Sequence, residues 1–253
     1  MRQIVAKLKP TGGFSHAFHL GLVVLLPILI FILVRLNNGF IQVALAIILL
    51  SKWRMFAVRP RYWGANIQAN AVDIIVGIST LIFMVHTSSA LWQLVWAALY
   101  GAWLVGIKPN SSVIGMISQA LIGQVFGLMA LFIEWPAAPL YGLVAGAGIV
   151  CYASARHFFE SFDEPYTKLL AYTWGYFGAA LTWVLGHFLL SSYGITYPAL
   201  LLTVIGFGLA ALYYLDHYDR LSDLLRREFI LVTCVIVGIV LVALYLGSRS
   251  KVV

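Results

Sequence analysis

Continuous apolar runs separated by short polar segments are the dominant pattern along the 253-residue chain. Most of these runs are roughly 17–22 residues long, close to the ~20 residues that a helix needs to cross the hydrocarbon core of a bilayer. Strands of a membrane barrel would instead alternate apolar and polar residues over about 10 positions. The pattern therefore predicts helices rather than strands. We expect nine of them, at residues 17–34, 40–53, 70–87, 90–107, 112–133, 138–155, 169–190, 198–215 and 229–247.

Composition supports a bilayer as the solvent for much of the chain. Hydrophobic residues make up 62% and charged residues 10%, with a mean hydropathy of +0.95. A soluble domain carries about 25% charged residues, so a soluble protein of this composition would leave too much apolar surface in water. Because backbone groups in hydrocarbon must pair internally, the expected fold class is all-α. We expect one polytopic, transmembrane helical domain over residues 1–253.

The distribution of Lys and Arg predicts the orientation of the helices. With the N-terminus inside, 13 of the 16 basic residues fall in inner segments, and only Arg35, Arg249 and Lys251 fall outside. Short cytoplasmic loops of membrane proteins carry such an excess. The split predicts an inner N-terminus and an outer C-terminus, in a multi-pass protein of the plasma (inner) membrane. It also explains the formal net charge of +7, so we expect the lipid bilayer, and no nucleic acid, as a partner.

Acidic residues gather in two inner segments, at spacings that place them on one helical face if the helices continue inward. The two groups follow the sixth and eighth expected helices and are Glu160, Asp163 and Glu164, and Asp216, Asp219 and Asp223. Mg²⁺ prefers oxygen ligands and usually bridges one or two carboxylates to substrate phosphates. Basic residues of neighbouring inner loops would clamp those phosphates. The candidates for this clamp are Arg54, Arg59, Arg61 and Lys108.

The same charges have a structural interpretation. Arg156 and Glu160 stand four residues apart, as do Asp216 and Arg220 in the later segment. Such i, i+4 pairs stabilise exposed helices by about 0.2–0.5 kcal/mol and need no ligand. The spacing of the charges is therefore compatible both with a metal–phosphate site and with solvated helix ends.

Several stretches resemble motifs of the UbiA-type membrane prenyltransferases. They are Arg59-Pro60-Arg61-Tyr62-Trp63-Gly64 after the second helix, Lys108, Ser118-Gln119 and Gly123-Gln124-Val125-Phe126-Gly127, and the acidic segment 160–164. Nine helices with an inner N-terminus are also the layout of that family. The resemblance implies an intramembrane transferase whose two acidic inner loops hold Mg²⁺ and a prenyl diphosphate. It implies an isoprenoid or other lipid substrate, bound at the cytoplasmic face.

The chain departs from that family where the first Asp-rich motif would follow the second helix. Ser51-Lys52-Trp53-Arg54 stands there and contains no acidic residue. The nearest match, Asp216-x-x-Asp219-x-x-x-Asp223, follows the eighth helix instead, with Leu215 in the place of Asn. The second motif uses Glu where the family uses Asp. These departures leave open whether the chain is an enzyme.

Two other functions fit the sequence. A small-solute transporter or permease would place Asp73, Gln119, Gln124 and His187 near its path, although paired broken helices, which mark many transporters, are not evident. A non-catalytic membrane scaffold needs no motif at all. In each case Gly142 and Gly146, a Gly-x-x-x-Gly pair, predict close approach of a neighbouring helix to the sixth one.

Overall fold

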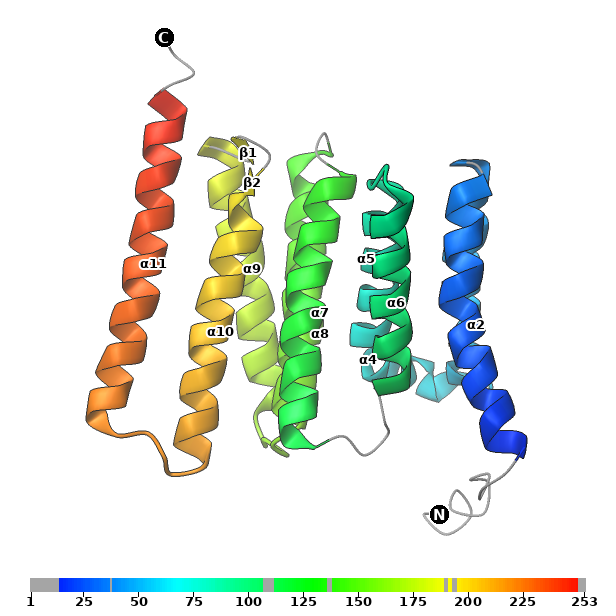
Figure 1. The fold of residues 1–253 in the computed structure, drawn as a ribbon. Helices are drawn as coiled ribbons and strands as arrows, with labels where there is room; N and C mark the ends of the chain where they lie inside the picture. Colours follow the sequence, from blue (N-terminus) through cyan, green and yellow to red (C-terminus); the bar gives the residue numbers. More distant parts are fainter. Residues whose placement is uncertain are drawn as a thin grey trace. The chain divides into compact units, whose positions relative to one another are not determined.

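The computed structural model describes residues 14–36, 38–106, 112–135, 138–188, 191–192 and 195–249, and its regular structure is almost entirely helical (Figure 1). The α-helices are α2 (Phe14–Leu36), α3 (Ile41–Ser51), α4 (Trp63–Ala69), α5 (Ala71–Val85), α6 (Ala90–Gly106), α7 (Val113–Glu134), α8 (Leu140–Glu160), α9 (Thr167–Phe188), α10 (Tyr197–His217) and α11 (Asp223–Arg249). Short 3-10 helices are η1 (Asn38–Phe40), η2 (Trp53–Met55) and η3 (Pro60–Tyr62). Two antiparallel two-residue strands, β1 (Ser191–Ser192) and β2 (Ile195–Thr196), precede α10. The all-α prediction is confirmed.

The expected and observed helices differ mainly at their ends. Each of the nine expected helices overlaps a described one, because a continuous apolar run favours a helix that satisfies its own backbone. Helix α4 was not expected, since polar residues such as Asn66 and Gln68 interrupt its apolar pattern. The segment from Pro60 to Ala69 meets α5 at an angle of 61°. Helices α8 and α10 also run further than expected, to Glu160 and His217.

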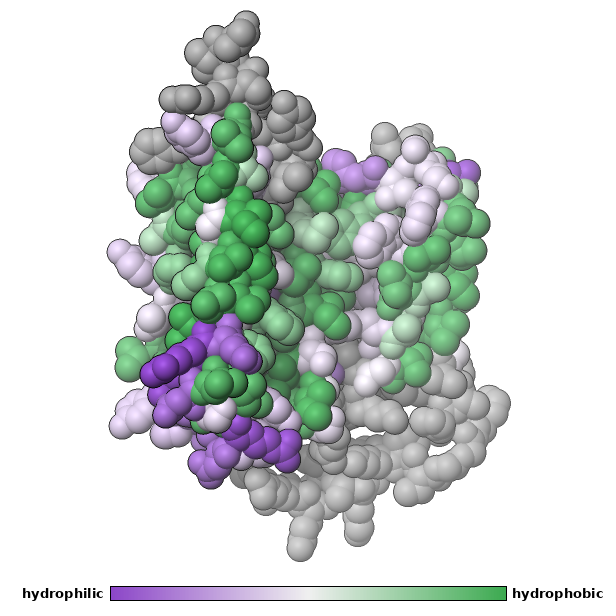
Figure 2. Space-filling view, turned by 60° about the vertical axis from the view of Figure 1, so that its left-hand side comes forward, coloured by the Kyte–Doolittle hydropathy of each residue, from purple (hydrophilic) through white to green (hydrophobic). Residues whose placement is uncertain are grey.

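Two of the described helices, α7 and α10, are long and apolar enough to cross a membrane, and the bent pair of η3–α4 with α5 would make a third. Shorter apolar helices are α3, α6 and the part of α2 from Val23 to Leu36. Large apolar side chains on other helices also face outward: Leu231 and Ile239 of α11 are each 63% exposed. Figure 2 shows this hydrophobic surface above a hydrophilic area. Soluble proteins rarely expose such extended apolar surface, so these helices suggest an association with a membrane.

The chain divides into two compact units. The first comprises Met1–Asn66 and Thr80–Ser111, and the second comprises Ile67–Ser79 and Ser112–Val253. The buried core of the first unit joins α2, α3, α6 and the end of α5, and consists of Ile30, Ala44, Ile48, Leu81, Met84, Ala97 and Tyr100. Within it the Nε2 of buried Gln93 donates to the carbonyl oxygens of Met84 (3.0 Å) and Thr87 (2.7 Å). These bonds fix the start of α6 against the end of α5.

The second unit is built around α8, which packs against α7 on one side and most extensively against α9 on the other. Its core consists of Leu128, Phe132, Leu143, Ala147, Val150, Cys151, Ala199 and Leu202. Glycine permits the close approach of α9: a Cβ at Gly178 would lie 2.6 Å from the sulfur of Cys151. Both cysteines of the chain are free, with Cys151 buried here and Cys234 exposed on α11.

The Gly-x-x-x-Gly pair of α8 behaves only partly as expected. A Cβ at Gly146 would lie 2.7 Å from Cδ1 of Leu131, so α7 does approach closely at this position. At Gly142 the same Cβ would have no atom of the described residues within 4 Å, and the prediction of a close neighbour there is wrong. The sequence spacing identifies a small-residue face, but only the packing shows how far along the helix the neighbour follows it.

Candidate functional site

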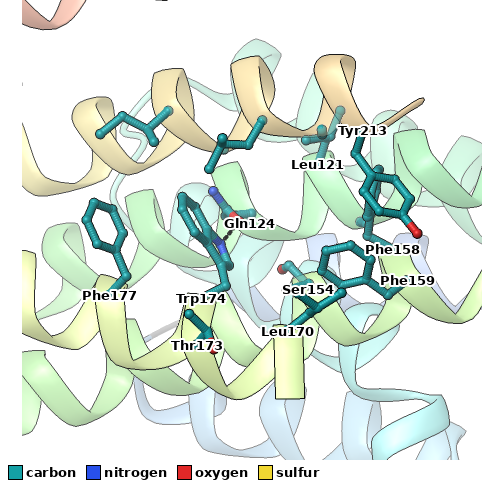
Figure 3. Close-up of a pocket in the computed structure, with 16 residues that line it drawn as sticks. Leu121, Gln124, Ser154, Phe158, Phe159, Leu170, Thr173, Trp174, Phe177 and Tyr213 are labelled. Carbon is teal, nitrogen blue, oxygen red and sulfur yellow. Dashed lines mark hydrogen bonds between the residues drawn. The ribbon is translucent and has the colours of Figure 1, made fainter. Parts of the chain in front are cut away.

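A cavity of about 550 Å³ lies in the second unit, between α7, α8, α9 and α10, and its lining residues Phe177 and Leu209 are exposed at the surface. Figure 3 shows aromatic side chains along it, from Phe177 at one end to Phe158, Phe159 and Tyr213 at the other. Most of the remaining wall is aliphatic. Ligand sites in proteins are commonly concave, mostly apolar and about 300–1,000 Å³ in volume, with a few polar groups that fix orientation. The cavity has these properties and is therefore the candidate functional site.

Gln124 is the polar centre of the cavity wall. Its side chain is 4% exposed, and both ends of its amide are engaged. The Nε2 donates to the carbonyl oxygen of Leu202 on α10 (2.9 Å), and the Oε1 accepts from the indole Nε1 of Trp174 on α9 (2.9 Å). Gly206 makes room for this amide, since a Cβ there would lie 2.5 Å from Nε2. One side chain of α7 thus connects three helices across an apolar interior.

Ser154 of α8 contributes a second polar group to the wall (Figure 3). The residue is 2% exposed, and its Oγ has no hydrogen-bond partner among the residues that the structure describes. Thr173, which also lines the cavity, instead donates to the carbonyl oxygen of Leu169 four residues earlier (3.0 Å). A buried hydroxyl without a partner costs about 1–3 kcal/mol, so the Ser154 hydroxyl is an unusual feature of this cavity.

Aromatic rings in edge-to-face contact gather at the Tyr213 end of the cavity. The ring of Tyr213 lies 5.1 Å from that of Phe159 and 5.1 Å from that of Phe162, and the ring of Phe162 lies 4.8 Å from that of His217. The Tyr213 hydroxyl donates to Oε2 of Glu164 at 2.5 Å. These contacts join the end of α10 to the connection between α8 and α9. The two predicted acidic segments therefore lie at the same end of the second unit (Figure 1).

A polar network surrounds the end of α8. The Nε of Arg156 donates to Oε1 of Glu160 (2.8 Å), and its Nη1 donates to the hydroxyl of Tyr152 (3.1 Å) and to Oε1 of Gln68. The neighbouring His157 has its Nε2 3.2 Å from Oε1 of a glutamine on α7, Gln119. The i, i+4 pairing of Arg156 with Glu160, which the sequence suggested as the structural alternative, is confirmed.

The prediction that each acidic group lies on one helical face is wrong. Helix α8 ends at Glu160 and α10 ends at His217, so the helices do not continue through the acidic segments. Asp163 (φ 51°) and Asp219 (φ 53°) adopt the left-handed conformation and turn the chain. Asp reaches this conformation more readily than most residues, because its short side chain can hydrogen-bond locally.

The carboxylates of these segments mostly meet protein groups rather than one another. Glu160 binds Arg156 and Glu164 accepts from Tyr213, as described above. Asp216 and Asp223 both face Arg226, at 3.7 and 3.9 Å, in exposed pairs of the kind that contribute little stability. Within the described ranges, no three His, Cys, Asp or Glu side chains gather in a group suited to a metal ion. The Mg²⁺ site at these residues stays a prediction.

The predicted phosphate clamp belongs to other parts of the chain. Arg59 precedes η3 and Arg61 lies within it, in the first unit, where the Arg61 guanidinium carbon is 4.5 Å from the ring centroid of Tyr62. The side chain of Arg54 and the whole of Lys108 lie outside the described residues. The side chain of His187, one of the transporter candidates, lies outside them as well. The clamp therefore also stays a prediction.

Sequence reasoning found part of this site and missed the rest. It singled out Gln124 as a polar group within a span, and the cavity confirms that the position is buried and polar. It did not single out Ser154, which stands between two alanines in an otherwise unremarkable apolar run, nor Trp174 and Tyr213. Nothing in the spacing of these residues shows that four helices converge on them.

Comparison of the chain with protein-family models, with curated proteins and with solved structures finds no match. The function must therefore be argued from the cavity itself.

Proposed function

We propose that this chain is a multi-pass membrane protein that binds the apolar chain of a lipid, such as an isoprenoid, in the cavity between α7 and α10. The observation that carries the proposal is the cavity: about 550 Å³, lined almost wholly by apolar and aromatic groups of four helices. Two of these four helices, α7 and α10, are long and apolar enough to span a bilayer. A ligand reaching such a cavity from a membrane would be a lipid.

The nine-span topology, with the N-terminus inside and the C-terminus outside, is part of the proposal. The 13 to 3 division of basic residues supports it, as does the exposed apolar surface of α11. Reporter fusions after residues 62, 110, 165 and 222 should report a cytoplasmic position. Fusions after residues 88, 137 and 194 and at the C-terminus should report an external one. A reversed position in the middle of the chain would reject this topology.

The two ends of the cavity differ in polarity, and this difference predicts the orientation of a bound lipid. Its Phe177 end is apolar, whereas at its other end the Tyr213 hydroxyl donates to Glu164. An amphiphile would place its tail toward Phe177 and its head at the Tyr213 end, because a charged head remains close to the membrane surface while the tail is buried. This direction supports the finer proposal, a divergent enzyme that transfers a prenyl or other lipid group at the cytoplasmic face.

Binding of cis-parinaric acid, whose fluorescence rises in apolar sites, tests the cavity directly. We expect purified protein in detergent to bind it saturably, and Ala210→Phe, which fills the cavity from α10, to weaken binding at least tenfold. Ala98→Phe adds the same ring on the exposed face of α6, outside this cavity, and should leave binding unchanged. Equal binding by all three proteins would reject the lipid site.

Farnesyl diphosphate separates the transferase from the other functions. If the acidic segments hold Mg²⁺, farnesyl diphosphate should displace parinaric acid more strongly with Mg²⁺ than with a chelator, because the metal bridges carboxylates to phosphate oxygens. Glu164→Gln should then reduce that dependence. If displacement is the same with Mg²⁺ and with a chelator, the protein binds lipid but the proposed diphosphate site is rejected. Absence of any lipid binding would favour the solute transporter or the non-catalytic scaffold.

A further inference from the structure

The polar groups of the cavity wall are almost all engaged within the protein. The Gln124 amide and the Trp174 indole bind each other, and Gln124 also reaches the Leu202 carbonyl. The Thr173 hydroxyl donates to a backbone carbonyl, and the Tyr213 hydroxyl donates to Glu164. These polar groups therefore need no hydrogen bond from a ligand, and an apolar ligand can contact the wall without leaving them unsatisfied.

Ser154 is the exception on this wall. Its Oγ is buried and lacks a hydrogen-bond partner in the described part of the chain. Helix hydroxyls usually resolve this problem by donating to the carbonyl four residues earlier, as Ser79 (2.7 Å) and Thr182 (2.8 Å) do here. For Ser154 that acceptor would be the carbonyl of Val150, and the bond is not made. The Ser154 hydroxyl thus has no partner among the described residues, and the residue lines the cavity.

The position of Ser154 along the cavity is also informative. In Figure 3 the residue lies between the Gln124–Trp174 pair and the aromatic end formed by Phe158, Phe159 and Tyr213. It stands six residues before Glu160, the last residue of α8, which is about 9 Å at 1.5 Å per residue. A group bound to Ser154 would therefore sit well inside the cavity, away from the head group of an amphiphile.

We infer that the lipid bound in this cavity carries an oxygen-containing group, a hydroxyl or a carbonyl, part way along its apolar chain, and that the Ser154 hydroxyl binds it. The inference rests on the proposed function and specifies its ligand class. A plain hydrocarbon tail would leave the hydroxyl unsatisfied in an apolar surrounding, which is unfavourable. A buried water is the competing occupant, but a buried water typically makes about three hydrogen bonds, and the neighbouring polar groups of Gln124 and Trp174 are already engaged.

Competition with fatty acids tests the inference. The probes are stearate and a series of hydroxystearates that carry the hydroxyl at successive carbons, each displacing cis-parinaric acid. We expect one member of the series to bind wild-type protein about five- to tenfold tighter than stearate, the gain of roughly one hydrogen bond. In Ser154→Ala this preference should vanish while stearate binds as before. Ser79→Ala removes a helix hydroxyl that is already bonded to the Ile75 carbonyl and lies outside the cavity lining, so it should keep the preference.

The possible outcomes separate the two proposals. If stearate binds but every hydroxystearate binds equally or more weakly, or if Ser154→Ala keeps the preference, the ligand class is wrong and the lipid site stands. If neither stearate nor the series binds, the lipid site fails and this inference fails with it. Thermal unfolding of Ser154→Ala provides the folding control. Its stability should equal or exceed that of wild type, because no hydrogen bond within the described residues is lost.

Discussion

Among the described residues, each unit buries one glutamine, and the two glutamines are used differently. Gln93 of the first unit donates only to carbonyls six and nine residues away, at the junction of α5 and α6. Gln124 of the second unit bonds Trp174 and the Leu202 carbonyl, 50 and 78 residues away. The first fixes a helical hairpin, whereas the second fixes the spacing of three helices around a cavity. A polar side chain in an apolar interior can thus stabilise either a local turn or a binding site.

The surroundings of the two glutamine side chains differ in the same way. A Cβ at Gly206 of α10 would contact both the Gln124 amide and, at 3.1 Å, the indole of Trp174. The hydrogen bonds of Gln124 to other helices therefore depend on a glycine at position 206. The Gln93 Oε1, by contrast, has no hydrogen-bond partner within the described residues. We therefore expect a substitution at Gln124 to disturb the packing of several helices, and a substitution at Gln93 to disturb only the junction of α5 and α6.

The largest expected effect is that of Gly206→Leu. The new side chain would displace the Gln124 amide and strain the contact with Trp174, so we expect the free energy of unfolding to fall by about 3 kcal/mol. Unfolding with SDS in mixed micelles measures this change. Gly142→Leu is the matched control, because a Cβ there has open space, and it should change stability little. Equal losses for the two variants would contradict the role given to Gly206.

Gln124→Leu should follow, with a loss of about 2 kcal/mol. It leaves the partly buried Trp174 N–H without its acceptor, and hydrogen bonds between membrane helices contribute roughly 0.6–1.7 kcal/mol each. Trp174→Phe removes the donor instead. The double variant should lose less than the sum of the two single losses, because both remove the same bond. Additive losses would show that the two side chains act independently.

Gln93→Leu should have the smallest effect, about 1 kcal/mol or less. It gives up two bonds to the backbone at Met84 and Thr87, but it also removes the Oε1 that lacks a partner in the described residues. The same SDS titration measures it beside Gln124→Leu. If Gln93→Leu were the more damaging of the two, the distinction between a local and a long-range glutamine would have to be abandoned.

The helices themselves could be predicted from the sequence because hydrophobic length and backbone pairing act locally. The ends could not, since they depend on single residues in turns. Asp163 and Asp219 adopt the left-handed conformation and turn the chain. The acidic residues around them therefore do not share one helical face, contrary to the prediction from the sequence. Helix α4 was missed because its short, polar-rich sequence gives no apolar run.

The candidate site was harder to predict for a different reason. A cavity is a property of several helices at once, and the sequence does not state which faces of α7, α8, α9 and α10 meet. Gln124 was recognisable as a polar residue in a span, but its partners Trp174 and Leu202 were not. Ser154 resembles any small residue that lets helices pack, and only the absence of the usual bond to the Val150 carbonyl sets it apart.

Because one free cysteine is buried and the other exposed, thiol labelling of the unmodified protein can follow its unfolding. Cys234 is exposed on α11, so a small, lipid-permeable maleimide should label it sooner than Cys151. Cys151 is buried against Gly178, at a close contact of α8 with α9, and it should react only when these helices separate. Mass spectrometry would count one label on folded protein and a second as the helices part. The rate of the second addition then measures opening beside the cavity, without any added probe.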